Sequence, residues 1–155
     1  MHGVIEKYSA VVFLLAITMS GCATSYQAKG LTGGYTETRL SEDAYQVQFE
    51  GNGYTSQEKA SRFILRRCAE LTLENGKRYF TITSNESQSS ASGYDGMMFS
   101  SPSGKANMKI LDGKKEAENA YDAVIVVEET NEVAGGQLSE KASQTLMSIK
   151  SQDSN

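Results

Sequence analysis

The stretch SQEKASRFILRRCAELTLENG, residues 56–76, predicts the helix on which the rest of the fold is built. Thr55 and Glu58 match a capping box, in which each side chain binds the other residue's backbone amide at the start of a helix. Gly76 suits the left-handed position that follows a helix. The apolar residues between these ends recur every three or four positions and share one helical face: Ala60, Phe63, Ile64, Cys68 and Leu71. We therefore predict a helix over residues 56–75.

Four residues of this helix carry charge or a thiol that calls for interpretation: Arg66, Arg67, Cys68 and Glu70. Arg66 and Glu70 are four residues apart, a spacing at which opposite charges pair on a helix surface. Arg66 and Arg67 together indicate a solvated helix flank, and the alternative is a site for an anionic group. Cys68 lies among the apolar residues, so we interpret it as a small buried hydrophobic residue. Redox chemistry, or pairing between molecules, is the alternative for Cys68.

Strand patterns flank the helix on both sides. Before it, residues 35–40 and the alternating Tyr45, Val47 and Phe49 predict a β-hairpin. After it come three strand candidates: residues 79–84, 107–111 and 123–129. The last is the strongest, because its unbroken Val/Ile run is typical of a strand in the middle of a sheet. We predict an α+β fold in which a small antiparallel sheet, the hairpin plus two or three later strands, packs on one main helix, with a C-terminal helix.

A serine-rich segment separates the strand candidate at residues 79–84 from the one at residues 107–111. Residues 84–104 contain eight serines and three glycines, which predicts a long loop. Loops of this length are uncommon in compact domains and are usually functional or disordered. Met97, Met98 and Phe99 form an isolated apolar triplet within it. The triplet either packs on the core, extends a strand, or is a candidate interaction site for a partner or for lipid.

The domain organisation follows from these patterns. We expect one α+β domain over residues 35–130 and a helical segment over 131–155, in which apolar residues at helical spacing follow Ser139 as N-cap. Residues 22–34 are polar and end in a glycine pair. We expect this segment to be a tether, which can hold the domain at most about 40 Å from its attachment point.

The first residues have the features of a targeting segment. Lys7 lies in a weakly positive start, and residues 10–19, AVVFLLAITM, contain no charge. A helix needs about 20 apolar residues to cross a bilayer, so this run is too short. A short apolar run between a charged start and small residues is typical of a secretory signal peptide, and a buried core helix is the alternative.

Residues 19–22, Met-Ser-Gly-Cys, resemble the lipobox of bacterial lipoproteins, with Met19 where leucine is commonest. The resemblance implies that a signal peptide over residues 1–21 is cleaved between Gly21 and Cys22. It also implies that the Cys22 thiol and the new amine receive acyl chains, such as palmitate, as a membrane anchor. Ala23 replaces the aspartate that often retains lipoproteins in the inner membrane. The implied location is therefore the periplasmic leaflet of the outer membrane, with the inner membrane as the alternative.

Several motifs together resemble one family of proteins. They are GCAT-x-YQ-x-KG-x-TGGY over residues 21–35, GNGYT over 51–55 and AELTLENG over 69–76. The combination is similar to small, functionally uncharacterised lipoproteins of Gram-negative bacteria. The resemblance supports lipid anchoring and an α+β domain, and it brings no catalytic residues.

Composition argues against several functions. The 155 residues carry a net charge of −4, whereas a nucleic-acid-binding protein usually shows a basic patch and a high pI. The only histidine, His2, lies in the predicted signal peptide. A mature chain without histidine has no Ser-His-Asp or Cys-His unit and no histidine-ligated zinc. We expect no metal, no cofactor and no nucleic-acid partner.

One motif is shared with enzymes. Ser56 and Lys59 match the S-x-x-K motif of penicillin-binding proteins and β-lactamases, but the companion motifs S-D-N and K-T-G are absent. We therefore interpret this stretch as the start of the helix, and a serine hydrolase is the less favoured reading.

These observations lead to an expected function. We expect a non-enzymatic, lipid-anchored envelope protein that acts by binding or by structural association, with an envelope protein or peptidoglycan as partner. The anchor would keep its effective concentration at the membrane high. The alternative is a stress-sensing or regulatory lipoprotein that uses the serine-rich segment, the C-terminal helix or Cys68.

Overall fold

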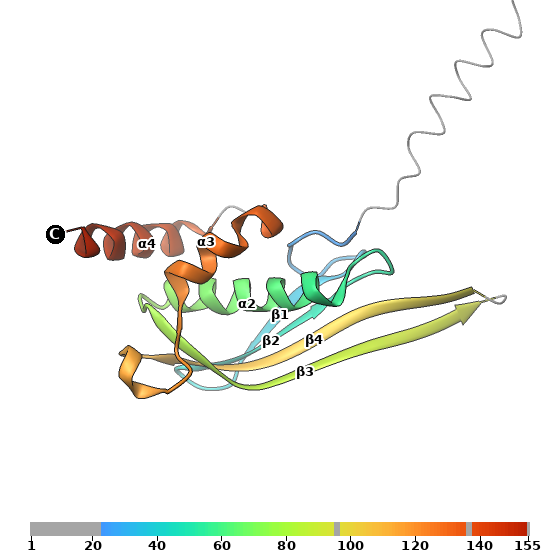
Figure 1. Ribbon diagram of the computed structural model, residues 1–155, viewed down its shortest axis with the longest axis horizontal. Coiled ribbons are helices and arrows are strands. Elements are labelled where there is room, and N and C mark those ends of the chain that lie inside the picture. The colour runs from blue at the N-terminus through green and yellow to red at the C-terminus, as the bar shows by residue number, and fades with distance from the viewer. Residues whose placement is uncertain (1–22, 95–96, 136–137, 155) are drawn as a thin grey trace, which may run out of the picture.

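The computed structural model describes residues 23–94, 97–135 and 138–154, with residues 88–101 described by their backbone alone. Within these residues the strands are β1 (Gly34–Arg39), β2 (Ala44–Glu50), β3 (Tyr79–Tyr94), β4 (Met97–Leu111) and β5 (Tyr121–Asp122). The helices are α2 (Gln57–Glu74), α3 (Ala123–Ala134) and α4 (Glu140–Asp153). The strands form one antiparallel sheet in the order β1-β2-β4-β3-β5, so the predicted α+β fold is confirmed (Figure 1).

The elements form three layers. Helix α2 lies across one face of the sheet and contacts β2, β3 and β4 (Figure 1). Helices α3 and α4 pack on the opposite side of α2. Helix α2 is therefore covered on two sides, although the sequence predicted contact with the sheet alone.

Alternating side chains of the sheet build the core against α2. Tyr45, Val47 and Phe49 on β2 are buried, as predicted, and Met108 on β4 lies opposite Tyr45. Phe63 of α2 meets the Phe49 ring edge-on, with 5.0 Å between the ring centroids. The same alternation turns the polar side chains to the sheet face away from α2, which none of the described helices covers.

The ends of α2 are close to those predicted, but its cap differs. Ser56, rather than Thr55, is the N-cap, and its hydroxyl accepts a hydrogen bond from the Lys59 amide at 3.1 Å. The predicted capping box of Thr55 and Glu58 is therefore wrong. The Thr55 hydroxyl instead accepts from the Thr24 amide and donates to Asn52 Oδ1. Gly76 adopts φ +73° after the helix, as predicted.

The segment predicted as the central strand, residues 123–129, is instead the first part of α3. Asp122 caps this helix by accepting a hydrogen bond from the Val124 amide, and Gly135 ends it at φ +55°. The buried residues recur at helical spacing: Ala123, Val126, Val127, Thr130 and Ala134. Packing of this face on α2 outweighs the modest strand preference of valine and isoleucine.

The serine-rich segment 84–104, predicted as a loop, lies largely in strands β3 and β4. The two strands pair from Tyr79 opposite Leu111 to Tyr94 opposite Met97, with a register shift between Ile82 and Ser84. Pairing between two neighbouring stretches of one chain gives each backbone group a partner. A strand therefore forms here without the apolar alternation on which the sequence prediction depended.

The segment predicted as a tether also folds onto the domain. Thr24 is buried, the Tyr26 ring packs 5.4 Å from that of Phe63, and the Tyr35 amide donates to the Gln27 carbonyl at 2.8 Å. Residues 24–34 are therefore part of the folded domain. They are not an extended tether that could hold the domain up to about 40 Å from its attachment point.

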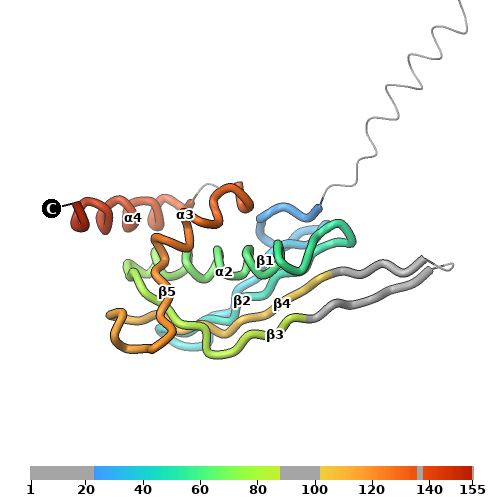
Figure 2. Tube along the Cα trace, viewed as in Figure 1, coloured from blue at the N-terminus to red at the C-terminus, as the bar shows by residue number. Residues whose placement is uncertain are grey.

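Helix α4 matches the predicted C-terminal helix, with Ser139 as its N-cap. The expected boundary after residue 130 falls inside α3, so this part of the chain is not a separate segment. Arg78 joins the two last helices, because its guanidinium donates to Asp122 at 2.9 Å and to Asp153 at 2.7 Å. The tube in Figure 2 shows how β5 leads into α3 beside the start of β3.

A glycine comparison tests whether the N-terminal segment belongs to the fold. Gly33 adopts φ +98°, and a Cβ there would lie 2.2 Å from the Glu50 carbonyl oxygen. We expect Gly33→Ala to lower the free energy of unfolding by at least about 2 kcal/mol, because the left-handed backbone and the clash both oppose the side chain. Denaturant unfolding followed by circular dichroism measures this loss.

Gly30→Ala is the matched control for Gly33→Ala. Gly30 lies three residues earlier in the same segment, and a Cβ there meets nothing within 4 Å. We expect the stability of Gly30→Ala to match that of the wild type. Equal stability of the two variants would mean that the segment does not pack on the domain.

Candidate functional site

The residues predicted from the sequence as functional have different outcomes. Gly21 and Cys22, the predicted cleavage and lipidation residues, lie outside the described residues. The backbone of Met97, Met98 and Phe99 belongs to β4 and pairs with residues 92–94 of β3, while their side chains lie outside the description. Among the described residues, the candidate site nearest in sequence to the predicted anchor at Cys22 is the set of hydrogen bonds around Thr24, here called the junction.

Thr24 is fixed by hydrogen bonds from two loops. Its amide donates to Thr55 Oγ1 at 3.0 Å and to Asn52 Oδ1 at 3.3 Å. Its hydroxyl donates to the Thr32 carbonyl at 2.7 Å and accepts from the Asn52 amide at 3.0 Å. Thr24 is 2% exposed. A polar residue that is buried with its amide and hydroxyl both bonded holds the chain in one position.

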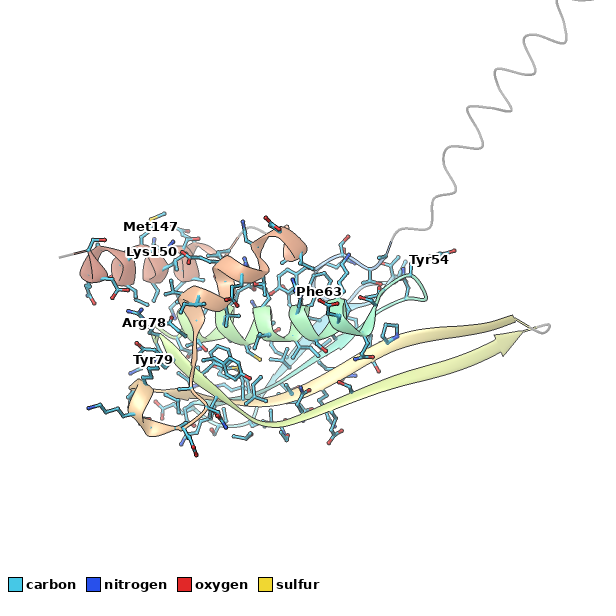
Figure 3. The ribbon with its side chains drawn as sticks, viewed as in Figure 1. Tyr54, Phe63, Arg78, Tyr79, Met147 and Lys150 are labelled. Atoms are coloured by element: carbon cyan, nitrogen blue, oxygen red, sulfur yellow. The ribbon has the colours of Figure 1, made fainter. Side chains whose placement is uncertain are left out.

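Two exposed side chains border this junction. Leu31 precedes Thr32 and is fully exposed, and Tyr54 precedes Thr55 and is 69% exposed. Tyr54 lies in the turn that leads into α2, where its amide donates to Asn52 Oδ1 at 3.1 Å. Figure 3 shows the Tyr54 side chain directed away from the body at the end of the molecule where the N-terminal segment enters. Nonpolar groups are therefore presented to solvent beside a rigidly held backbone.

A buried ion pair lies between α2 and α3. Arg66 is 0% exposed, and its Nε donates to Glu70 Oε1 at 2.7 Å, so the predicted pairing is confirmed. Arg66 Nη1 also donates to the Val127 carbonyl of α3 at 2.7 Å. The Tyr26 hydroxyl donates to the other oxygen of Glu70. Burial, together with the Glu70 charge, raises the pKa of Tyr26, so this phenol stays protonated as a donor.

Arg67 extends the pair into a charged cluster that reaches β1. Its guanidinium binds Glu37 through two bonds of 2.9 and 3.0 Å and contacts Glu70 and Glu74 at 3.1 Å each. Burial opposes the charge on Arg67, but the hydrogen bonds to Glu37 and the charges of Glu74 and Glu37 outweigh it and raise its pKa. The Ser139 hydroxyl donates to Glu74 at 3.0 Å and adds the start of α4.

The prediction that Arg66 and Arg67 form a solvated flank is therefore wrong. The third layer of helices covers the side of α2 that the sequence assigned to solvent. Both guanidinium groups already bind carboxylates, so these arginines stabilise the packing of α2. The sequence did contain a signal for the third layer, because the α3 segment has apolar residues at helical spacing between Asp122 and Gly135.

Ser56 and Lys59 have structural roles at the start of α2. The Ser56 hydroxyl accepts from the Lys59 amide, and the Lys59 ammonium lies 5.5 Å from the centroid of the Phe63 ring. A helix cap and a cation–π contact account for both residues without hydrolytic chemistry.

Cys68 is a buried thiol, as predicted. It is 0% exposed and has no disulfide partner among the described residues. Burial raises the pKa of the Cys68 thiol to about 12. Thiolate is the reactive form, so this environment suppresses redox chemistry at Cys68.

The face of the sheet away from α2, here called the open face, is polar. It carries amide, hydroxyl and charged side chains: Thr36, Gln46, Gln48, Ser103, Lys105, Asn107 and Lys109. Gln46 donates to Asn107 at 2.9 Å, and Lys105 pairs with Glu86 at 3.2 Å. A shallow pocket of about 120 Å³ lies between Gln48, Glu86 and Lys105. An antiparallel sheet with one apolar and one polar face is stable with the polar face in water.

Within the described ranges, no group of three or more histidine, cysteine, aspartate or glutamate residues is arranged to hold a metal ion, and no helix is long and apolar enough to cross a membrane. Comparison of the chain with protein-family models, with curated protein sequences and with solved structures gives no match.

The buried pair yields a stability prediction. We expect Arg66→Met to lower the free energy of unfolding by up to about 3–5 kcal/mol, because Glu70 keeps only Arg67 as a cationic partner and the Val127 carbonyl loses its donor. The double variant Arg66→Met/Glu70→Leu should recover part of this loss, since it leaves neither charge alone. Denaturant unfolding of the single and double variants forms a double-mutant cycle that measures the coupling.

Arg62→Met is the control for Arg66→Met. Arg62 pairs with Glu58 at 3.3 Å at the same spacing on the same helix, but its side chain is 48% exposed. Solvent screens such pairs, so we expect a change below about 1 kcal/mol. An Arg66→Met variant as stable as Arg62→Met would show that the buried pair does not support the fold.

A further prediction concerns the Cys68 thiol. In a Cys22→Ala background Cys68 is the only cysteine. We expect a thiol reagent at pH 7 to modify it only when the protein unfolds. A pKa near 12 in place of 9.0 lowers the thiolate fraction about a thousandfold, and burial blocks access as well. Met147→Cys in a Cys22→Ala/Cys68→Ala background supplies an exposed control thiol. Fast modification of Cys68 in the folded protein would support the redox-sensing alternative.

Proposed function

We propose that the protein is a lipid-anchored component of the Gram-negative envelope, in which the Cys22 thiol receives lipid and the signal peptide is then cleaved behind Gly21, and that it has a non-enzymatic binding or structural role. The observation that carries this proposal is the lipobox-like stretch at residues 19–22, which is followed after one residue by the buried Thr24. Cleavage before Cys22 would remove the apolar residues 10–19 and no residue that the structure describes. Their removal by a signal peptidase is therefore compatible with the fold.

The strength of the anchor depends on the number of acyl chains. Each buried CH₂ group contributes about 0.8 kcal/mol, and one chain gives only marginal, reversible binding. A diacylglyceryl group on the Cys22 thiol, with or without a third chain on the amine, would hold the protein on the membrane. Ala23 and the resemblance to small Gram-negative lipoproteins favour the periplasmic leaflet of the outer membrane as the location.

The described side chains favour binding over catalysis. Ser56 and Lys59 act in a helix cap and a cation–π contact. Cys68 is buried, and His2 precedes the proposed cleavage position. The open face supplies hydrogen-bonding groups in an ordered array, which suits a polar partner such as peptidoglycan or the surface of another envelope protein. A regulatory role through Cys68 is less well supported, because its thiol is shielded from solvent.

The anchor is tested by replacing the acylated residue. We expect Cys22→Ala to remain uncleaved or to leave the membrane fraction, because no thiol is left for lipid attachment. Cys68→Ala is the matched control and should fractionate with the membrane as the wild type does. Cell fractionation and the mass of the purified protein measure both effects. Normal processing and membrane association of Cys22→Ala would refute the proposal.

A further inference from the structure

The residues around Thr24 bring three features to one end of the domain. Cys22 is two residues before Thr24 in the sequence. Leu31 is bonded directly to Thr32, whose carbonyl accepts the Thr24 hydroxyl at 2.7 Å. Tyr54 is bonded directly to Thr55, whose hydroxyl accepts the Thr24 amide at 3.0 Å. The backbone of Leu31 and of Tyr54 is therefore held close to Thr24, which follows the proposed lipid attachment point by two residues.

The exposure of these two side chains is unfavourable in water. Leu31 is fully exposed and Tyr54 is 69% exposed, although both are large and largely apolar. The segment that carries Leu31 is not loose, because Gly33 and Gly34 adopt positive φ angles against the Glu50, Gln27 and Ala28 carbonyls. Tyr54 is held by the hydrogen bond from its amide to Asn52 Oδ1 at 3.1 Å. Isolated exposed apolar residues are common on protein surfaces. Leu31 and Tyr54 differ from the others in their position next to the residue that is proposed to carry lipid.

A bilayer surface fits these side chains chemically. Tyrosine is enriched at the level of the lipid headgroups, where its ring meets hydrocarbon and its hydroxyl meets water. Leucine gains free energy by leaving water for the acyl region. The neighbouring charges are balanced, since Lys29 pairs with Glu50 at 2.7 Å. No net charge at this pair opposes approach to a membrane that also carries anionic lipids.

We propose that Leu31 and Tyr54 enter the bilayer beside the acylated Cys22, so that the domain rests directly on the membrane in one orientation. This inference rests on the proposed lipid anchor. It goes further by naming Leu31 and Tyr54 as the part of the domain that contacts the lipid. Helix α4, which carries Met147, lies on the other side of the molecule from Tyr54 (Figure 3), so we expect α4 to stay clear of the membrane. The buried Thr24 connects the anchor to the domain and fixes this orientation.

Tryptophan fluorescence tests the orientation, because the chain contains no tryptophan of its own. The acylated full protein carries Tyr54→Trp in one sample and Met147→Trp in another. Tyr54 and Met147 are both 69% exposed, which makes the second variant a matched control on α4. Each protein is reconstituted into vesicles of phosphatidylethanolamine and phosphatidylglycerol, with and without lipids brominated on their acyl chains.

We expect the emission of Tyr54→Trp to shift to shorter wavelength and to fall at least about twofold with brominated lipid. Leu31→Trp should behave in the same way, whereas Met147→Trp should keep the emission of a solvent-exposed residue. If the proteins float with the vesicles but Tyr54→Trp and Leu31→Trp resemble Met147→Trp, the orientation is wrong and the anchor stands. If shielding occurs without quenching by brominated lipid, a second copy of the protein covers this surface instead, and the orientation is wrong. If the wild type does not float with vesicles, both proposals fail.

Discussion

The ion pair of Arg66 and Glu70 is the constraint on which the three layers depend. Helix α2 brings both charges into the interior, where Arg66 depends on Glu70 and Glu70 is paired with both Arg66 and Arg67. Each charge is then used to recruit a further element. Arg66 binds the Val127 carbonyl of α3, and Glu70 accepts from Tyr26 of the N-terminal segment. The geometry of one salt bridge thus sets the position of segments that are distant in the sequence.

Much of the fold was predictable from local pattern. The hairpin follows from the alternation of Tyr45, Val47 and Phe49, and α2 follows from its apolar face and from Gly76. The start of α4 at Ser139 is encoded in the same local way. These elements share one property, since the side chains that decide them lie within a few residues of each other. The burial of Cys68 was predictable for the same reason.

The remaining elements depend on contacts that a local pattern does not contain. Residues 123–129 form a helix because they pack on a charged face of α2, and residues 84–104 pair because β3 and β4 supply each other's hydrogen bonds. The junction at Thr24 joins residues 28 and 31 positions apart. The sequence identifies residues 22–34 as polar. Only the tertiary structure shows that the amide and hydroxyl of Thr24 bind Asn52, Thr55 and Thr32.

The valine-rich start of α3 also constrains how the chain reaches this structure. An Ala-Val-Ile-Val-Val sequence without charge has a high tendency to form intermolecular β-structure when it is exposed. It becomes a helix on the surface of α2, and part of its docking is the contact between Arg66 and Val127. A chain in which α2 forms late would leave this segment free to aggregate. Early completion of α2, which its local contacts favour, would therefore protect the protein during its own folding.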